Sequence, residues 1–305
     1  MWLILAFTSA CLLGFYDIFK KMSLRDNPVI PVLFLNTLFC SLLFIPLIVV
    51  SAYTPWLDET MFHVASGSLA DHAHIMLKSL IVLSSWICGY VAIKHLPITI
   101  VGPINATRPV MVLVGAMLVY GEHLNLWQWA GVLLAIVSFF LLSRSGRREG
   151  INFAQNRWIF FLVLAAVLGA VSGLYDKYLM ASRGHGGIDL DELMVQSWFN
   201  VYQMVLMGIM LVLLWWPKRK TGTPFRWRWS IPCISLFICM ADFAYFLALG
   251  HDGSMISMVS MIRRGSVVVS FLFGALIFRE RNLRSKAFDM FLVLLGMVCI
   301  WIGSH

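Results

Sequence analysis

Long apolar segments follow one another along almost the whole chain, and only short polar connections separate them. A helix that crosses a bilayer core needs about 20 predominantly apolar residues. Ten segments approach or exceed that length, at residues 3–20, 29–50, 76–93, 98–119, 126–143, 158–179, 194–216, 230–249, 254–278 and 285–303. The pattern predicts an all-α integral membrane protein with ten transmembrane helices. The first segment lacks an A-x-A cleavage site, so we expect a retained helix rather than a signal peptide.

Composition agrees with this pattern. Hydrophobic residues make up 60% of the 305 residues and charged residues 12%, whereas soluble domains carry about 25% charged residues. The mean hydropathy is +0.83. All six cysteines lie inside apolar segments without a C-x-x-C spacing, so we predict small core residues and neither a metal nor a cofactor.

The basic residues are divided unevenly among the connections. Most of the 23 lysines and arginines lie in or beside the odd-numbered connections, counted along the chain, and most acidic residues lie in the even-numbered ones. Cytoplasmic loops are enriched in Lys and Arg. We therefore predict cytoplasmic odd-numbered connections and both termini outside, with a bacterial inner (plasma) membrane as the location. The pI near 9.3 follows from this topology, so we expect no nucleic-acid partner.

The two halves of the chain share short sequence matches in the same order, which indicates a duplication. The matched positions are Gly14–Asp17 with Gly173–Asp176, Asn36 with Asn200, Tyr90 with Tyr245, and Glu122 with Glu280. Each half holds five predicted helices, and an odd number inserts the second half upside down. We therefore predict two inverted repeats, residues 1–146 and 147–305. Such repeats are typical of secondary transporters with a substrate site near the midplane; the alternative is a duplication kept only for packing.

Two stretches also carry a family resemblance. The end of the first segment, Gly14–Lys21, and the stretch LVYGEHLNLWQWAGVLLAIVSFFLL resemble the EamA-type ten-helix members of the drug/metabolite transporter superfamily. The pattern recurs around Glu280, where Arg279 replaces a glycine. The resemblance extends over nearly the whole chain and implies inverted five-helix repeats and alternating access. It implies no single substrate, because members carry amino acids, drugs, sugars, nucleotide sugars and phosphate esters. Many members place both termini in the cytoplasm, and the charge distribution here departs from them.

Three arginines lie deep inside apolar segments. Arg263 and Arg264 are about ten residues into segment 254–278, and Arg108 is at a similar depth in segment 98–119. Pro109 follows Arg108, removes a backbone donor and can kink the helix. A charge at the bilayer centre costs about 2.5–3.5 kcal/mol and usually faces the bundle interior or a wet cavity. Asp242 is the only acid that we place at this depth, so we predict a net positive charge there.

The arginines suggest an anionic or zwitterionic small-molecule substrate, because a guanidinium matches a carboxylate or phosphate. Triose-phosphate translocators of the same superfamily are similar in having a phosphate-binding basic pair in the comparable helix. The candidate substrate-binding residues are Arg108, Arg263, Arg264, Tyr90, Tyr245 and Trp86. The alternative is that the arginines are structural and bind Asp242 and backbone carbonyls.

Asp17 and Asp176 occupy equivalent positions near the ends of two predicted helices. They are candidates for coupling transport to a proton or another ion. The alternative is that they cap helices or pair with Lys20, Lys21 or Lys177. Asp242 is a further candidate for charge pairing.

Three functions compete. The leading hypothesis is a secondary transporter of a small anionic or zwitterionic metabolite. The second is a flippase for a lipid phosphate or a lipid-linked sugar, which would need membrane lipid as its partner. The third is a membrane enzyme built on His251 and Asp252. No nucleophile motif or phosphate loop accompanies that pair, so we predict that the protein is not an enzyme.

Overall fold

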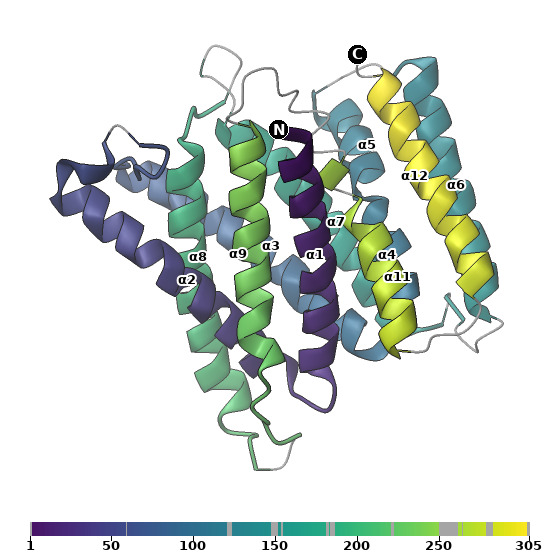
Figure 1. Ribbon diagram of the computed structural model, residues 1–305, viewed down its shortest axis with the longest axis horizontal. Helices are drawn as coiled ribbons and strands as arrows, with labels where there is room; N and C mark the ends of the chain where they lie inside the picture. The colour runs from purple at the N-terminus through teal and green to yellow at the C-terminus, as the bar shows by residue number, and fades with distance from the viewer. Residues whose placement is uncertain are drawn as a thin grey trace.

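Long helices lie side by side and turn back at alternate ends of one bundle in the computed structural model of the chain (Figure 1). The structure describes residues 2–58, 60–120, 124–147, 152–153, 155–180, 183, 187–220, 223–249, 262–263, 265–278 and 283–303. Within these ranges every regular element is a helix. The prediction of an all-α protein is confirmed.

The helices follow the apolar segments closely. The first half contains α1 (Trp2–Leu24), α2 (Val29–Tyr53), α3 (Leu69–His95), α4 (Ile98–Ala106), α5 (Arg108–Tyr120) and α6 (Leu126–Arg147). The second half contains α7 (Arg157–Met180), α8 (Glu192–Met210), α9 (Ser230–Leu249), α11 (Ser266–Phe278) and α12 (Leu283–Gly303). A 3-10 turn, Pro55–Leu57, follows α2, and a π-helical turn, Leu211–Trp215, continues α8. Seven of the described helices are long and apolar enough to cross a membrane, namely α1, α2, α3, α6, α7, α12 and α8 with its π-helical continuation.

The prediction of one continuous helix over residues 98–119 is wrong. The chain forms α4 and α5 instead, with Thr107 in a turn between them. Pro109 has no N–H to donate, so a helix can begin here but cannot pass through without losing a hydrogen bond. Of segment 254–278, residues 254–261 and Arg264 lie outside the described residues, and α11 begins after a turn at Gly265. The match of Glu122 with Glu280 aligns Arg108 and Ser266, the first residues of α5 and α11.

Helices of the first half pack mainly against helices of the second half. The main pairs are α1 with α9, α3 with α7, α2 with α8 and α6 with α12, and α1 also packs on α11 while α5 packs on α7. Replacing each helix by its counterpart in the other half converts the α1–α9 pair into the α7–α3 pair, and the α1–α11 pair into the α7–α5 pair. The packing therefore repeats the symmetry that the sequence matches suggest.

Serine hydroxyls connect these helix pairs at the backbone. Ser9 Oγ donates to Ala241 O at 2.7 Å between α1 and α9, and Ser85 Oγ donates to Ala165 O at 2.7 Å between α3 and α7. Ser138 Oγ donates to Asp289 O at 2.6 Å between α6 and α12. Small polar residues of this kind allow close helix approach and satisfy their own hydroxyls without water.

Two glycines, Gly131 of α6 and Gly296 of α12, allow close packing of these two helices (right side of Figure 1). A Cβ on Gly131 would lie 2.6 Å from Gly296 O, which is too close for backbone atoms to accept without a shift. We expect Gly131→Val to separate the two helices and to lower the free energy of unfolding by about 1–3 kcal/mol. Thermal unfolding of the purified protein measures this. Leu133→Val, on an exposed position of the same helix, is the control, and equal melting of the two variants would contradict the packing.

Candidate functional site

Two cavities lie inside the bundle and share part of their walls. The smaller cavity has a volume of about 240 Å³ and the larger about 440 Å³. Both are lined by Ser85, Trp86, Arg108 and Ile238. The two cavities therefore meet at Arg108 and Trp86.

The helices place the two cavities in opposite halves of the bundle. Along α3, Lys78 and Val82 line the smaller cavity, and Gly89 and Tyr90 line the larger one. A helix rises 1.5 Å per residue, so the smaller cavity lies toward the beginning of α3 and the larger toward its end. Asp176, near the end of the antiparallel helix α7, also lines the smaller cavity, in agreement with this order.

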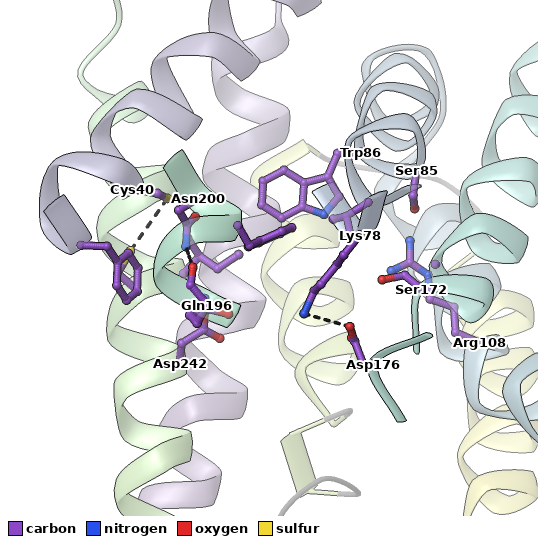
Figure 2. A pocket seen from close by; sticks show the side chains of 16 residues that line it. Cys40, Lys78, Ser85, Trp86, Arg108, Ser172, Asp176, Gln196, Asn200 and Asp242 are labelled. Atoms are coloured by element: carbon purple, nitrogen blue, oxygen red, sulfur yellow. Dashed lines mark hydrogen bonds and ion pairs between the residues drawn. The ribbon is translucent and has the colours of Figure 1, made fainter. Parts of the chain in front are cut away.

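Arg108 is the first residue of α5 and projects from the break between α4 and α5 toward both cavities. Figure 2 shows its guanidinium between Ser85 and Ser172. A Cβ on Gly169 would lie 3.0 Å from Arg108 Cζ, so a glycine at this position of α7 leaves room for the guanidinium. Arg108 Nε is buried and has no hydrogen-bond partner. Within the described part of the chain, no acidic side chain forms an ion pair with Arg108.

Arg263 lies at the larger cavity in a different setting. Its Nη2 donates to Asp242 Oδ1, and its guanidinium lies over the ring of Tyr245 with Cζ 4.5 Å from the centroid. Gln196 Nε2 donates to the other carboxylate oxygen of Asp242 at 3.4 Å. The charge of Arg263 is therefore balanced by the protein itself. This agrees with the alternative interpretation, in which the arginine is structural and binds Asp242.

Two ion pairs between an aspartate and a lysine also line the cavities. Lys20 Nζ is 2.6 Å from Asp17 Oδ1 at the larger cavity, and Lys78 Nζ is 2.8 Å from Asp176 Oδ1 at the smaller one (Figure 2). Asp17 and Asp176 therefore line the cavities in addition to Asp242. Asp176 pairs with Lys78 of α3, which is not one of the lysines that we considered for it.

From the sequence we considered Lys20 as a partner of Asp17, and the structure shows that pair. Neither lysine was predicted at a substrate site, because both were counted with the connections and helix ends. Lys20 is 9% exposed and Lys78 is 7% exposed, within α1 and α3. Lys20 Nζ also lies 4.4 Å from the ring centroid of Tyr16, and Lys78 Nζ lies 5.2 Å from that of Phe199. A signal was present in α3, where Lys78 and Ser85 are seven residues apart and so lie on one helical face.

The structure brings the described candidate residues together at the two cavities. Those at the larger cavity are Arg108, Arg263, Tyr90, Tyr245, Trp86 and Asp17, and those at the smaller one are Arg108, Trp86, Asp176 and Asp242. Arg264, His251 and Asp252 lie outside the described residues. Sequence reasoning missed the further polar lining residues Lys78, Ser85, Asn105, Ser172 and Gln196, and it considered Lys20 only as a partner of Asp17.

Comparison with known proteins finds a family model that matches part of the chain and a solved structure of similar fold. Residues 1–144 match the model of the EamA-like transporter family. A solved structure titled "Crystal structure of protein" is similar, with a TM-score of 0.60 and 16% sequence identity over 97% of this chain and 94% of that chain. At this identity the similarity concerns the fold alone. The sequence matches no curated protein.

Proposed function

We propose that this chain, whose residues 1–144 match the model of the EamA-like transporter family, is a secondary transporter of a small anionic or zwitterionic metabolite. The family match agrees with the resemblance in the sequence, and together with the long apolar helices it supports an integral membrane protein of the drug/metabolite transporter type. The observation that supports the proposal most strongly is the meeting of two cavities at one arginine, Arg108.

For the architecture we propose two inverted five-helix repeats, residues 1–146 and 147–305. Two observations support this proposal. The helix pairs interchange when the halves are exchanged, and α5 and α11 begin at aligned residues. In this arrangement α4 and α5 together form the fourth helix of the first repeat, and α11 completes its counterpart in the second.

For the mechanism we propose alternating access around Arg108. In one state the smaller cavity opens toward the beginning of α3, and in the other the larger cavity opens toward its end. The substrate anion stays bound at Arg108 while the two halves move, as in other inverted-repeat transporters. Asp17 and Asp176 lie on the two sides of this site, each paired with a lysine, and they are the positions that we propose for coupling to a proton or another ion.

The orientation follows from charge. Lys20, Lys78 and Lys286 are buried within helices, but the remaining lysines and arginines still favour the odd-numbered connections. We therefore propose that the termini and the smaller cavity face outward from a bacterial inner membrane. A flippase for a lipid phosphate or a lipid-linked sugar remains the alternative function.

The proposal is tested by cysteine labelling in a variant that lacks the six native cysteines. Ser172→Cys places a thiol in the smaller cavity and Gly89→Cys places one in the larger. We expect an impermeant thiol reagent outside intact cells to label Ser172→Cys, and the same reagent in inside-out vesicles to label Gly89→Cys. Ser66→Cys and Thr223→Cys, in exposed even- and odd-numbered connections, report the sidedness.

The outcomes separate the two parts of the proposal. Labelling of both cavity thiols from one side only would contradict alternating access. Labelling of Thr223→Cys from outside and of Ser66→Cys from inside would reverse the orientation and leave the access mechanism intact.

A further inference from the structure

Among the described residues, the charges at the larger cavity leave one guanidinium without a counterion, and we infer that the transported molecule is a monocarboxylate with a neighbouring hydroxyl and a flat apolar body. This inference rests on the proposed transport function and narrows its substrate class.

The first argument is charge balance. Among the described residues at the larger cavity, Lys20 pairs with Asp17 and Arg263 pairs with Asp242, whereas Arg108 has no acidic partner. A buried charge is costly unless an opposite charge accompanies it. One carboxylate neutralises Arg108. A phosphate monoester brings a second negative charge, and a zwitterion brings an ammonium group whose possible acidic partners already hold cations.

The second argument concerns two polar atoms on either side of the break between α4 and α5. Arg108 Nε and Asn105 Oδ1 are both buried and lack hydrogen-bond partners, and both residues line the larger cavity. An unsatisfied buried donor or acceptor costs about 1–3 kcal/mol, so a ligand that satisfies both gains affinity. A carboxylate accepts from the guanidinium. A hydroxyl on the next carbon suits Asn105 in either orientation of its amide, because a hydroxyl both donates and accepts.

The third argument is the shape and chemistry of the walls. Cations already lie over three rings of the larger cavity: Lys20 over Tyr16 and Tyr90, and Arg263 over Tyr245. Trp86 is the aromatic side chain that lines both cavities, as Arg108 does. Its indole provides an apolar surface for a flat substrate body. The volume of about 440 Å³ falls in the usual range for small-molecule sites, about 300–1,000 Å³.

The experiment compares four probes that share a phenyl group and differ in charge. They are 3-phenyllactate, phenylalanine, phenyl phosphate and the uncharged 3-phenyl-1,2-propanediol. The full chain is purified in a neutral detergent at pH 7.5, and its melting temperature is followed against the concentration of each probe. A ligand that binds the native state raises the melting temperature as its concentration exceeds Kd. We expect a saturable rise with 3-phenyllactate and at least tenfold weaker binding of the other three.

Two variants connect this binding to the atoms named above. Arg108→Lys keeps the charge and removes the planar fork, so we expect at least tenfold weaker binding of 3-phenyllactate. Asn105→Leu should remove the advantage of 3-phenyllactate over 3-phenylpropionate, which lacks the hydroxyl. Arg25→Gln, whose side chain is 77% exposed, is the matched control and should bind as the unchanged protein does.

Several results would overturn the inference. Phenylalanine binding as tightly as 3-phenyllactate would mean that the cavity offers a free negative charge to an ammonium group. Phenyl phosphate binding as tightly would indicate a second available cation, and equal binding of the diol would exclude charge recognition. If none of the probes raises the melting temperature, the substrate class is wrong, while the cysteine labelling above still decides whether the two cavities serve transport.

Discussion

The Arg108→Ala variant should reach the membrane in normal amounts, unfold at the same temperature as the unchanged protein or higher, and lose substrate uptake. Arg108 has no acidic partner in the described part of the chain, so its removal breaks no ion pair and relieves a charge at membrane depth. Truncating one partner of a buried charge pair costs about 2–5 kcal/mol of binding. With a bound anion as the partner, uptake at low substrate concentration should fall by at least about 30-fold.

Membrane abundance, melting temperature and uptake have to be measured on the same preparations. Arg108→Lys serves as the intermediate case, because it keeps the positive charge and loses the two-pronged hydrogen bonding. If Arg108→Ala disappears from the membrane, or melts several degrees lower, the arginine holds helices together and the anion site is refuted. Normal uptake by Arg108→Ala would refute it equally.

Removing Arg263 or Asp242, unlike removing Arg108, should destabilise the protein. The side chains of Arg263 and Asp242 are 22% and 20% exposed. They form an ion pair that joins the segment just before α11 to α9. Removing one partner of such a pair leaves a buried charge without compensation, which typically costs about 3–5 kcal/mol of stability. We therefore expect Arg263→Ala and Asp242→Ala each to lower the melting temperature strongly and to reduce the amount of protein in the membrane.

The double variant distinguishes an ion pair from two independent effects. Because it removes both charges together, Arg263→Ala combined with Asp242→Ala should be more stable than the sum of the two single losses predicts. Thermal unfolding of the two single variants and the double variant measures this coupling. Additive losses would argue against the pair. An Arg263→Ala variant that melts normally and no longer transports would instead place Arg263 among the residues that bind substrate.

The contrast between Arg108 and Arg263 shows which features of the site could be predicted from the sequence. The apolar segments of the sequence predicted the positions of the helices, because membrane insertion depends on local composition. The sequence also showed how deep both arginines lie within their segments. It did not show which arginine has a carboxylate partner. The Arg263–Asp242 contact depends on the rotation and packing of two helices, and these are set by side-chain fit rather than by any periodic pattern.

The buried lysines illustrate the same limit. Lys78 is the tenth of the 27 residues of α3, and a count of loop charges treats it as part of a connection. Its pairing with Asp176 follows from the packing of α3 on α7, which joins residues from the two halves of the chain. The break before Arg108 was easier to anticipate, since Pro109 marks it in the sequence.

That break has an electrostatic consequence. The peptide dipoles of a helix add up to about half a positive charge at its N-terminus. Arg108 and Ser266, the first residues of α5 and α11, both line the larger cavity, so the positive ends of two half-length helices face it. Ala106, at the negative C-terminal end of α4, lines the same cavity and offsets part of this positive charge. The backbone thus contributes to the electrostatic field in the cavity, and substitutions that leave these three helix ends in place should preserve that contribution.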